Sequence, residues 1–562
     1  MPTATPYTDR HNPDLLSRIP LTARVVLDVG CHTGALGAAY RRLNPNARLL
    51  GIEADPEAAA IAATRLDAVQ SVDLEGDPLP FDLPEGLDCL IYGDVLEHLR
   101  DPWAVLARQI AALRADGTML ICVPNVEHWS FIARLLRGDW DYQNTGLFDR
   151  THLRWFTRKT MEAGLARLGL HICDVTPRIF AAASGRDFLA GLAPGLTQLG
   201  LDVEDHAARA LPLQYIWRVQ KTARAVLHVA ATMLRPVGGV SDVRITYPQQ
   251  AIGTDPTVVT HVGPVGDFPK LSRETPKIAI LHRPILSGAA GLATLRGLID
   301  DDWVIVTEFD DYPDHFPAMR QPDQYAFRGV HAVQTTTEPL AEILRQHNHA
   351  VAVFPNAVRE LPDPRNFTDP TALTLFFGAL NREPDWQELL PALNEVARRA
   401  GDKLRFRVIH DQALFAALDT PHKEFTPTCD HATYLERLGG SEISFMPLRD
   451  TPFNRAKSDL KFIEAAASRV TPLVSPVVYA ASVINGQTGV MFHSAEELRT
   501  RLSELVAFPA MAREIADAAR AYVARERMLA DQVAARVAWY RQLWDQRADL
   551  TAALRDRLGA AR

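Results

Sequence analysis

The chain has 562 residues, 47% of them hydrophobic and 23% charged, with a formal net charge of −8. This length is too great for one hydrophobic core, so we expect two or three domains. The acidic balance argues against a general nucleic-acid binder, because neutralising phosphates requires a basic surface. The five cysteines (Cys31, Cys89, Cys122, Cys173 and Cys429) form no Cys-x-x-Cys pair. They are expected to be small core residues, with neither a zinc site nor a disulfide framework.

Neither a secretion signal nor a membrane-spanning segment is expected. The first residues, MPTATPYTDRHNPDLL, lack an apolar core, which a secretory signal requires. No run approaches the roughly 18 apolar residues of a spanning helix. Together with the unpaired cysteines, these features predict a cytoplasmic protein. If its substrate is membrane-bound, the protein would act peripherally at the inner face of the plasma membrane.

Residues 24 to about 180 alternate short β-rich runs with longer helical patterns. This alternation is typical of an α/β domain with a parallel sheet covered on both faces. The predicted strands are Val25–Val29, Leu49–Glu53, Cys89–Tyr92 and Met119–Val123, and the predicted helices lie around Leu36–Leu43, Pro56–Leu66 and Trp103–Ala115.

Strand signals vanish from about 181 to 235, so a helical connector is expected there. The stretch Leu213–Arg235 is predicted as a helix with basic residues among apolar ones. A packed connector helix is the favoured interpretation, and a peripheral membrane contact is the alternative.

Two further α/β series follow and predict two Rossmann-like lobes with a cleft between them. The expected boundaries are 1–180 for the first domain, 181–235 for the connector, 236–370 for the first lobe and 371–545 for the second. Strands are predicted in VRITYP, TVVTHV, KIAILHRP, WVIVTEF, HAVQTTT and VAVFPNAV, then in LTLFFGAL, LRFRVIH, SEISFMP and TPLVSP, before a helical tail over about 510–558.

The segment VVLDVGCHTGALG places two glycines, Gly30 and Gly34, between a buried strand and a helix. Glycine lets the backbone turn tightly there and approach a ligand. Glu53 ends the next strand, where a carboxylate suits ribose hydroxyls. A dinucleotide site would need glycine at 30, 32 and 35, but histidine and alanine occupy the last two positions. The spacing instead favours the D-x-G-x-x-x-G loop of an S-adenosylmethionine (SAM) site, beginning at Asp28.

Together with three later motifs, this loop resembles the class I SAM-dependent methyltransferases over roughly residues 20–180. The resemblance implies that Asp73, in SVDLEGDPLPF, contacts the adenine amino group. YGDVLEHLRDP resembles the segment after the fourth strand of ubiquinone-biosynthesis O-methyltransferases and adds Asp94 to the cofactor-binding set. FDRTHLRWFT resembles the substrate-side segment of methyltransferases encoded with polysaccharide enzymes.

Two histidines are candidate catalytic bases. Methyl transfer from a sulfonium depends mainly on positioning, but a sugar hydroxyl is a poor nucleophile at neutral pH and benefits from a base. His98 follows Asp94 by four residues and is expected to face the cleft beyond the strand ends. His152, in THLRWF, is the second candidate. For each histidine, a structural role in holding a loop is the alternative.

Residues 236–545 resemble GT-B glycosyltransferases, especially the retaining group that builds bacterial surface polysaccharides. The segment Gly238–Arg244 looks like the glycine-rich first loop of the acceptor-side lobe, which places Gly239 at the donor site. FFGALNREPDWQELLPAL looks like the first strand-turn-helix of the donor-side lobe, and NRAKSDLKFIEAAASRVTPLVSPVVYA like its nucleotide-binding segment. The resemblance implies a nucleotide-sugar donor as co-substrate.

The first donor-side candidate is Arg382. A nucleotide diphosphate requires cations and free backbone N–H groups. Asp385 and Glu388 are predicted as an N-cap and its capping-box partner, which would start a helix just after Arg382 and aim its side chain at the cleft.

A second group of donor-side candidates surrounds Ser458, the predicted N-cap of another helix. Lys457 and Lys461 flank this helix start. Two lysines there oppose the helix dipole, and a polyanionic ligand explains them better than packing does. Glu464, one turn beyond Lys461, is expected to hold the ribose hydroxyls.

The chain departs from the resembled pattern at two positions. Ala456 stands where the family usually has a glutamate eight residues before Glu464, and Gln387 replaces a frequent lysine.

The sequence also bears on metal binding. A metal-dependent GT-A enzyme needs Asp-x-Asp at a strand end, whereas Asp300–Asp302 precedes its strand and is predicted as a solvated turn. No metal is therefore expected. Glu308, Asp310 and Asp311 follow that strand and are candidates for lining the acceptor side, with an ordinary loop as the alternative.

The leading hypothesis is a bifunctional enzyme of bacterial surface-polysaccharide assembly, with SAM and a nucleotide sugar as co-substrates. One domain would methylate a sugar hydroxyl and the other would add a sugar to a glycan or lipid-linked glycan. The alternatives are a methyltransferase carrying a catalytically inactive GT-B glycan-binding module, and a scaffold protein of a polysaccharide assembly complex. No nucleic-acid partner is expected.

Overall fold

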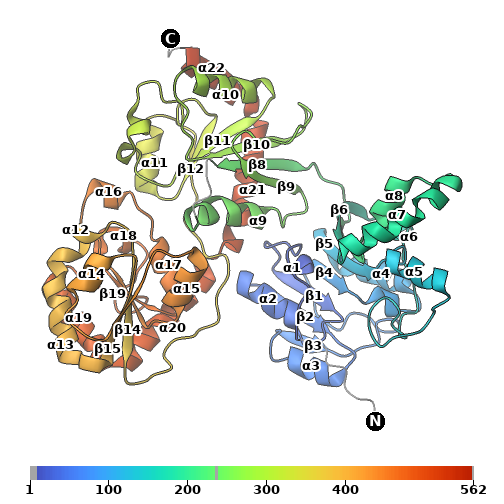
Figure 1. Ribbon diagram of the computed structural model, residues 1–562, viewed down its shortest axis with the longest axis horizontal. Coiled ribbons are helices and arrows are strands. Elements are labelled where there is room, and N and C mark those ends of the chain that lie inside the picture. The colour runs from blue at the N-terminus through green and yellow to red at the C-terminus, as the bar shows by residue number, and fades with distance from the viewer. Residues whose placement is uncertain (1–8, 234–237, 560–562) are drawn as a thin grey trace. The chain divides into compact units, whose positions relative to one another are not determined.

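The computed structural model describes residues 9–233 and 238–559, and the chain divides into two compact units (Figure 1). Unit 1 extends to Ala225 and includes Thr254–Thr257. Unit 2 holds Val226–Gly253 and the chain from Val258 onward. In the part of the chain that the structure describes, no helix is both long and apolar enough to cross a bilayer.

Unit 1 is built around a seven-stranded sheet in the order β3-β2-β1-β4-β5-β7-β6. Its first five strands are parallel, and β7 runs antiparallel to both β5 and β6. The strand order reverses between β1 and β4, and ligands of open α/β sheets bind outside the carboxyl ends at such a point. The strands are β1 Val25–Val29, β2 Arg48–Ile52, β3 Ala68–Gln70, β4 Leu87–Gly93, β5 Leu113–Pro124, β6 His171–Arg178 and β7 Gln214–Gln220.

Helices cover this sheet, and its centre is mainly apolar. Leu27, Leu90 and Ile121 have no exposed surface, as expected for strands buried on both faces. The helices are α1 Pro13–Leu16, α2 Ala35–Leu43, α3 Pro56–Ala62, α4 Pro102–Gln109, α5 Trp129–Arg137, α6 Arg158–Arg167, α7 Ala182–Gln198 and α8 Val203–Ala210.

The helix predicted over Leu213–Arg235 is wrong. The chain there forms β7 in unit 1 and β8, Leu227–Met233, in unit 2; Arg235 lies outside the described residues. The basic residues of this stretch had suggested one polar face of a helix. Arg218 is instead buried, and its Nε lies 2.5 Å from Asp174 Oδ2 on β6. The amphipathic helix on which a membrane contact depended is therefore not formed.

Unit 2 contains two six-stranded parallel sheets (Figure 1). The first lobe has the order β13-β12-β11-β10-β8-β9 and the second lobe β16-β15-β14-β17-β18-β19. The first-lobe strands are β8, β9 Val258–Pro264, β10 Lys277–His282, β11 Val304–Glu308, β12 Ala332–Thr335 and β13 Val351–Val353. The second-lobe strands are β14 Leu373–Gly378, β15 Leu404–Ile409, β16 Lys423–Thr426, β17 Ile443–Met446, β18 Thr471–Val474 and β19 Val490–Met491.

The predicted strand VRITYP is wrong as well. Asp242–Thr246 forms a π-helical turn that leads into α9, Tyr247–Ile252. Three consecutive residues of this turn, Val243, Arg244 and Ile245, are all buried. The glycine-rich segment before it therefore follows β8 and precedes a helix, the arrangement that a phosphate-binding loop requires.

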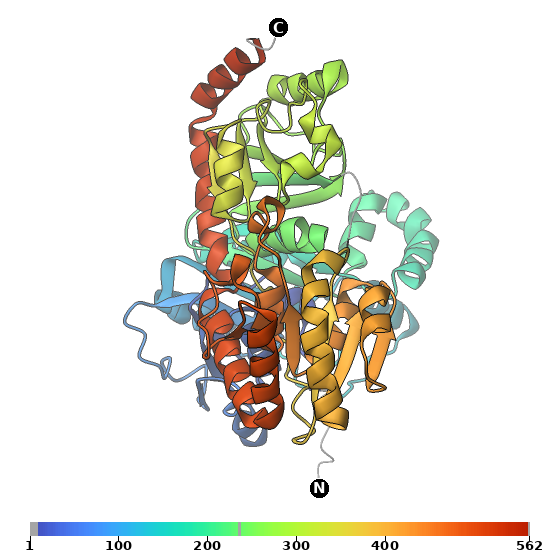
Figure 2. The same ribbon diagram turned by 90° about the vertical axis from the view of Figure 1, so that its left-hand side faces the viewer.

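The C-terminal helices return from the second lobe to the first. In Figure 2 they run alongside the first lobe. Leu554 belongs to the first lobe's core, and Tyr540 donates to Gln334 of β12 at 2.8 Å. The helices of unit 2 are α9, α10 Gly288–Asp300, α11 Glu338–Arg345, α12 Glu383–Trp386, α13 Leu390–Ala400, α14 Gln412–Ala417, α15 His431–Gly439, α16 Pro452–Arg455, α17 Leu460–Ala467, α18 Pro476–Tyr479, α19 Ala495–Ala507, α20 Pro509–Glu526, α21 Ala530–Asp545 and α22 Arg547–Gly559.

Candidate functional sites

The loop after β1 has the tight turn that its glycines predict. Gly30 and Gly34 adopt φ values of 71° and 74°, which favour glycine. A Cβ on Gly30 would lie 2.5 Å from Val95 Cγ2, and one on Gly34 would lie 3.2 Å from Ala62 Cα. Both glycines are therefore required by backbone conformation and by close packing.

The carboxylate of Glu53 is fixed beside this loop, at the carboxyl end of β2. Its Oε2 accepts a hydrogen bond from the His32 amide at 2.7 Å, and its Oε1 accepts one from the Asp55 amide at 2.9 Å. The structure thus brings together two features that lie 23 residues apart in the sequence, Gly30 and Glu53.

Asp28 lies inside the sheet beneath the loop. Burial, reinforced by the charge of Glu53, raises the pKa of this carboxyl to about 7. The folded state therefore holds the proton up to about pH 7, whereas an unfolded chain releases it near pH 3.8. Stability contributed by this proton is present at acidic pH and is lost as pH rises between these two values.

Replacing Asp28 with asparagine should accordingly stabilise unit 1 at pH 8, by up to about 4 kcal/mol. The gain should shrink to nothing near pH 4. Thermal unfolding of the full chain between pH 4 and 9 checks this, and a gain independent of pH would contradict it.

The other two predicted cofactor residues have different surroundings. Asp94 follows β4 with φ 58°, and its Oδ1 accepts a hydrogen bond from Gln214 Nε2 at 2.5 Å. Asp73 is exposed, and its Oδ1 accepts a hydrogen bond from the Glu75 amide at 2.9 Å. Asp94 therefore lies at the carboxyl edge of the sheet, whereas Asp73 shapes a turn.

The two candidate bases, His98 and His152, come together with a third residue that the sequence did not single out. Their ring centroids are 4.9 Å apart. Ligand atoms of Glu97, His98 and His152 lie within 4.8 Å of one another. Glu97 is 1% exposed, and neither of its carboxylate oxygens has a hydrogen-bond partner. The signal was present in the motif YGDVLEHLRDP, which contains both Glu97 and His98.

Burial raises the pKa of Glu97 well above its usual value, with the charge of Asp94 adding to the effect. His98 is oriented by a hydroxyl: its Nδ1 lies 3.0 Å from Thr151 Oγ1, which donates to Asp149 at 2.7 Å. The Thr151 hydroxyl therefore accepts from His98 Nδ1–H, and this leaves Nε2 as the free lone pair.

In unit 2, the carboxyl ends of both sheets surround a cavity of about 290 Å³. Four of the five predicted donor-site residues line it: Arg382, Lys457, Lys461 and Glu464. The fifth, Gly239, is not among the lining residues; its φ is 83°, and a Cβ there would lie 3.6 Å from the His431 ring.

The three predicted donor-site cations of the cavity, Arg382, Lys457 and Lys461, have neutral partners as well as acidic ones. Arg382 donates to Asp385 at 3.0 Å and to Asn454 at 2.8 Å. Lys461 donates to the Gly378 carbonyl at 2.5 Å, and burial lowers its pKa to about 8. Burial also lowers the pKa of Lys457. An anion bound beside these two lysines would favour their charged forms and so oppose the lowering of their pKa values.

Both predicted N-caps are wrong by a few residues. Arg382 itself is the N-cap residue of α12, and Asp385 lies inside that helix and accepts from Arg382, Asn454 and the Arg449 amide. The N-cap of α17 is Asp459, one residue after Ser458. In each case the side chain of the predicted N-cap residue forms hydrogen bonds with residues distant in the chain instead.

Glu464 is paired within the cavity wall. His431 Nε2 lies 2.9 Å from Glu464 Oε1, and this contact raises the pKa of His431. The imidazole therefore holds one oxygen of the carboxylate and leaves the other for a ligand hydroxyl.

The acidic residues after β11 separate into two kinds. Glu308 is wrong as a lining residue, because it has no exposed surface and pairs with the buried Arg244 at 2.8 Å. Asp310 and Asp311 do line the cavity. Asp300–Asp302 is exposed at the end of α10, as the predicted solvated turn requires.

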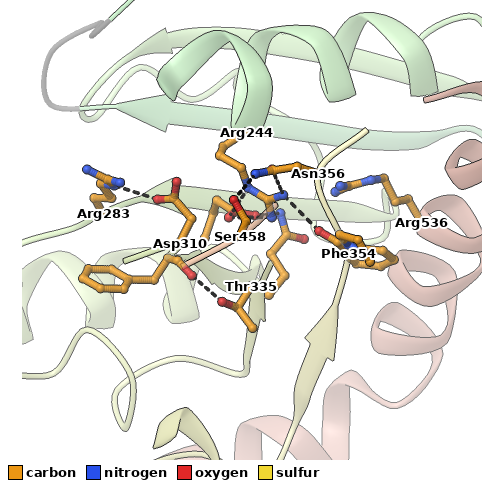
Figure 3. Close-up of polar contacts among 12 residues, drawn as sticks. Arg244, Arg283, Asp310, Thr335, Phe354, Asn356, Ser458 and Arg536 are labelled. Atoms are coloured by element: carbon orange, nitrogen blue, oxygen red, sulfur yellow. Dashed lines mark hydrogen bonds and ion pairs between the residues drawn. The ribbon is translucent and has the colours of Figure 1, made fainter. Parts of the chain in front are cut away.

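A hydrogen-bonded chain connects this buried pair to the second lobe (Figure 3). Arg244 donates to the Phe354 carbonyl at 2.9 Å and to Asn356 Oδ1 at 3.0 Å. Asn356 in turn donates through Nδ2 to Ser458 Oγ at 2.8 Å. The base of the first lobe is thereby joined to the start of α17, beside Lys457.

Comparison with known proteins is consistent with this division. Residues 27–119 match the family model described as "Methyltransferase domain". A ubiquinone biosynthesis O-methyltransferase of Rhodopseudomonas palustris (strain BisB5) is 30% identical over 167 residues, which cover 29% of this chain and 64% of the relative. The chain thus spans less than two thirds of that relative's length. One from Xylella fastidiosa is 25% identical over 170 residues, 65% of its length.

Solved structures resemble each unit at low sequence identity. Anabaena HepE, solved with UDP and glucose, is 12% identical and covers 56% of this chain and 99% of its own, with a TM-score of 0.39. Staphylococcus aureus TarM is 11% identical over 47% of this chain and 55% of its own, with a TM-score of 0.37. An Archaeoglobus fulgidus SAM-dependent methyltransferase covers 35% and 86%, with 17% identity and a TM-score of 0.25. TM-scores this low do not establish a fold, which follows instead from the strand order and connectivity of this chain.

Proposed function

We propose that this chain, whose first unit carries a class I methyltransferase domain and whose second unit has the GT-B glycosyltransferase fold, is a bifunctional transferase of bacterial surface-polysaccharide assembly. Unit 1 would methylate a sugar hydroxyl, and unit 2 would transfer a sugar from a nucleotide donor to a glycan or lipid-linked glycan. The observation that carries the proposal is the cavity of unit 2, where Arg382, Lys457 and Lys461 gather beside Glu464. This set suits a nucleotide diphosphate and its ribose.

The residues of unit 1 fit SAM. The loop Gly30–Gly34 leaves no room for side chains at its two glycines, so its backbone can approach a ligand closely. Glu53 is fixed at the adjacent strand end for the ribose hydroxyls, and Asp94 lies across the switch point. When bound, SAM supplies an electrophilic methyl group. The chain's own task is to orient an acceptor hydroxyl toward that group and to remove its proton.

The cluster of Glu97, His98 and His152 is the place for that proton transfer. If the two histidines had only a structural role, the two buried carboxylate oxygens of Glu97 would have no partner. This would lower the stability of the folded state. Glu97, His98 and His152 would hold a divalent cation, with His98 presenting Nε2 because its Nδ1 is held by the Thr151 hydroxyl. The cation would lower the pKa of an acceptor hydroxyl, whose proton would then pass to solvent, since both histidines would act as ligands rather than as bases. For unit 1 this proposal departs from the expectation that no metal is bound.

Replacing Glu53 with alanine should weaken SAM binding by about 10- to 100-fold, because two charge-assisted hydrogen bonds to ribose are lost. Calorimetric titration of SAM into the full chain measures this. Glu57→Ala, an exposed change in the first turn of α3, is the matched control. SAM affinity that is equal in all three proteins would contradict the assignment of Glu53.

For unit 2 the direct test is calorimetric titration of UDP, followed by a panel of nucleotide sugars. We expect UDP to bind the wild-type chain and to bind much more weakly after Lys461→Met, which removes a half-buried cation from the cavity. If no nucleotide binds, the assignment of unit 2 as a glycosyltransferase is rejected.

A second candidate function is a methyltransferase with a non-catalytic GT-B glycan-binding module. Ala456 and Gln387 favour it, since each replaces a charged residue of the resembled family. Under either function we place the chain in the cytoplasm, at the inner face of the plasma membrane where the acceptor is lipid-linked.

A further inference from the structure

The carboxylate of Glu464 is held by an imidazole from another helix. Its Oε1 lies 2.9 Å from His431 Nε2, and the Glu464 and His431 side chains are 11% and 15% exposed. An ionised carboxylate can only accept hydrogen bonds, so the imidazole must carry a proton on Nε2. His431 is the first residue of α15, and Glu464 lies on α17, 33 residues later. The contact therefore fixes a cavity-lining side chain by means of a residue distant in the chain.

Glu464 is also the carboxylate best placed for the ribose of a nucleotide. Among the described lining residues of the cavity it is the only carboxylate of the second lobe, since the other two belong to the first. The cations that suit a diphosphate, Arg382, Lys457 and Lys461, lie in this same lobe. Lys461 and Glu464 are one turn apart on one face of α17. A ribose is attached directly to its diphosphate and would meet Glu464 when the diphosphate meets Lys461.

We propose that His431 is a positioning residue that orients Glu464 toward both ribose hydroxyls, and that unit 2 thereby selects ribonucleoside diphosphate sugars over their 2′-deoxy counterparts. This inference rests on the glycosyltransferase function proposed above and names the class of its donor nucleotide.

Without the contact to His431, a neighbouring cation would compete for Glu464. Lys461 is three residues away on the same helix, a spacing at which opposite charges pair. Such a pair would consume a ligand of the diphosphate and the ligand of the ribose together. In the structure Lys461 instead donates to the Gly378 carbonyl and lies 3.5 Å from the Tyr434 hydroxyl. The two opposite charges thus have separate partners, and each stays available for the nucleotide.

The imidazole of His431 has neighbours from both lobes. The Tyr434 ring, three residues further along α15, stacks on it with a centroid distance of 6.1 Å and an interplanar angle of 24°. From the first lobe, a Cβ on Gly239 would lie 3.6 Å from His431 Cδ2, an ordinary contact distance. The glycine-rich loop after β8 therefore packs beside the residue that orients Glu464.

A carboxylate fixed in this way discriminates between nucleotides by hydrogen bonds. Glu464 Oε2 and the remaining lone pair of Oε1 can each accept a hydrogen bond from one hydroxyl of a vicinal diol. A nucleotide that lacks the 2′-hydroxyl leaves one of these positions without a donor at a largely buried group. A site built to bind a hydroxyl rejects the analogue without it more strongly than an apolar pocket rejects a missing methylene.

The test compares nucleotides by calorimetric titration into the full chain: UDP, GDP and ADP, each against its 2′-deoxy form. We expect at least one ribonucleotide to bind, about 10- to 100-fold more tightly than its deoxy form. His431→Phe keeps a ring beside Gly239 and Tyr434 but removes the donor, so that Glu464 is free to pair with Lys461. Both nucleotides should then bind more weakly, and the preference should fall to about threefold or less.

A second variant separates the hydrogen bond from the packing of the ring. His431→Gln should restore most of the preference, because its amide nitrogen can replace Nε2 as the donor. Glu436→Gln, an exposed change on the same helix, is the matched control and should leave both affinities unchanged.

Equal affinity of the wild-type chain for a ribonucleotide and its deoxy form would overturn the inference, as would tighter binding of the deoxy form. A wild-type preference in His431→Phe would show that the imidazole does not orient Glu464, even if both affinities fall together. A preference in His431→Gln no greater than in His431→Phe would assign the ring to packing alone and reject the positioning role. If no nucleotide of the panel binds, the glycosyltransferase function itself fails, a result distinct from the others.

Discussion

Glu308→Ala is expected to lower the free energy of unfolding of unit 2 by about 3–5 kcal/mol, because it leaves buried cations without their counter-charge. Glu308 has no exposed surface and accepts from Arg244 Nε at 2.8 Å and from Gln334 Nε2 at 2.7 Å. Arg536 is also buried, with its guanidinium 4.3 Å from the Phe354 ring (Figure 3). Removing the carboxylate would leave two arginines in a region of low polarity.

Urea unfolding of the full chain, followed through the transition of unit 2, measures this effect. The double variant Glu308→Leu with Arg244→Met is the decisive control, since removing both partners of a buried pair costs far less than removing one. We expect it to recover much of the lost stability. If Glu308→Ala were as stable as the wild type, the pair of Glu308 and Arg244 would not stabilise the first lobe.

The second large effect concerns the cation proposed for unit 1. The wild-type chain, freed of metal by a chelator, should bind one Mn²⁺ or Zn²⁺ per chain in a calorimetric titration. Glu97→Gln should weaken that binding by 10- to 100-fold or more, because it removes the only anionic ligand of the cluster. Chelation should also reduce methyl transfer strongly, since the cation lowers the pKa of the acceptor hydroxyl.

The pH dependence of this binding has a definite sign. The pKa of Glu97 is raised by burial, so the empty site holds a proton that the cation must displace. Affinity should therefore rise with pH. Glu162→Gln, at the exposed surface of α6, is the matched control. Equal metal affinity of Glu97→Gln and the wild type, or affinity that falls as pH rises, would contradict the site.

The sequence by itself determined the features that depend on neighbouring residues. The β1 strand was predicted with its observed bounds, and the loop Gly30–Gly34 was identified because glycine spacing and backbone conformation are local properties. The cationic residues Arg382, Lys457 and Lys461 were likewise recognisable from their positions at predicted helix starts, although the N-caps themselves differed. The three-part α/β organisation followed from the alternation of strand and helix patterns.

Only the tertiary structure decided features that depend on partners distant in the chain. Residues 214–220 form a strand because β5 and β6 pair with them, whereas the charged residues of this stretch had indicated a helix. Glu97 becomes a ligand candidate because His152, 55 residues away, lies beside it. Burial and long-range pairing set these roles, and neither is encoded in local spacing.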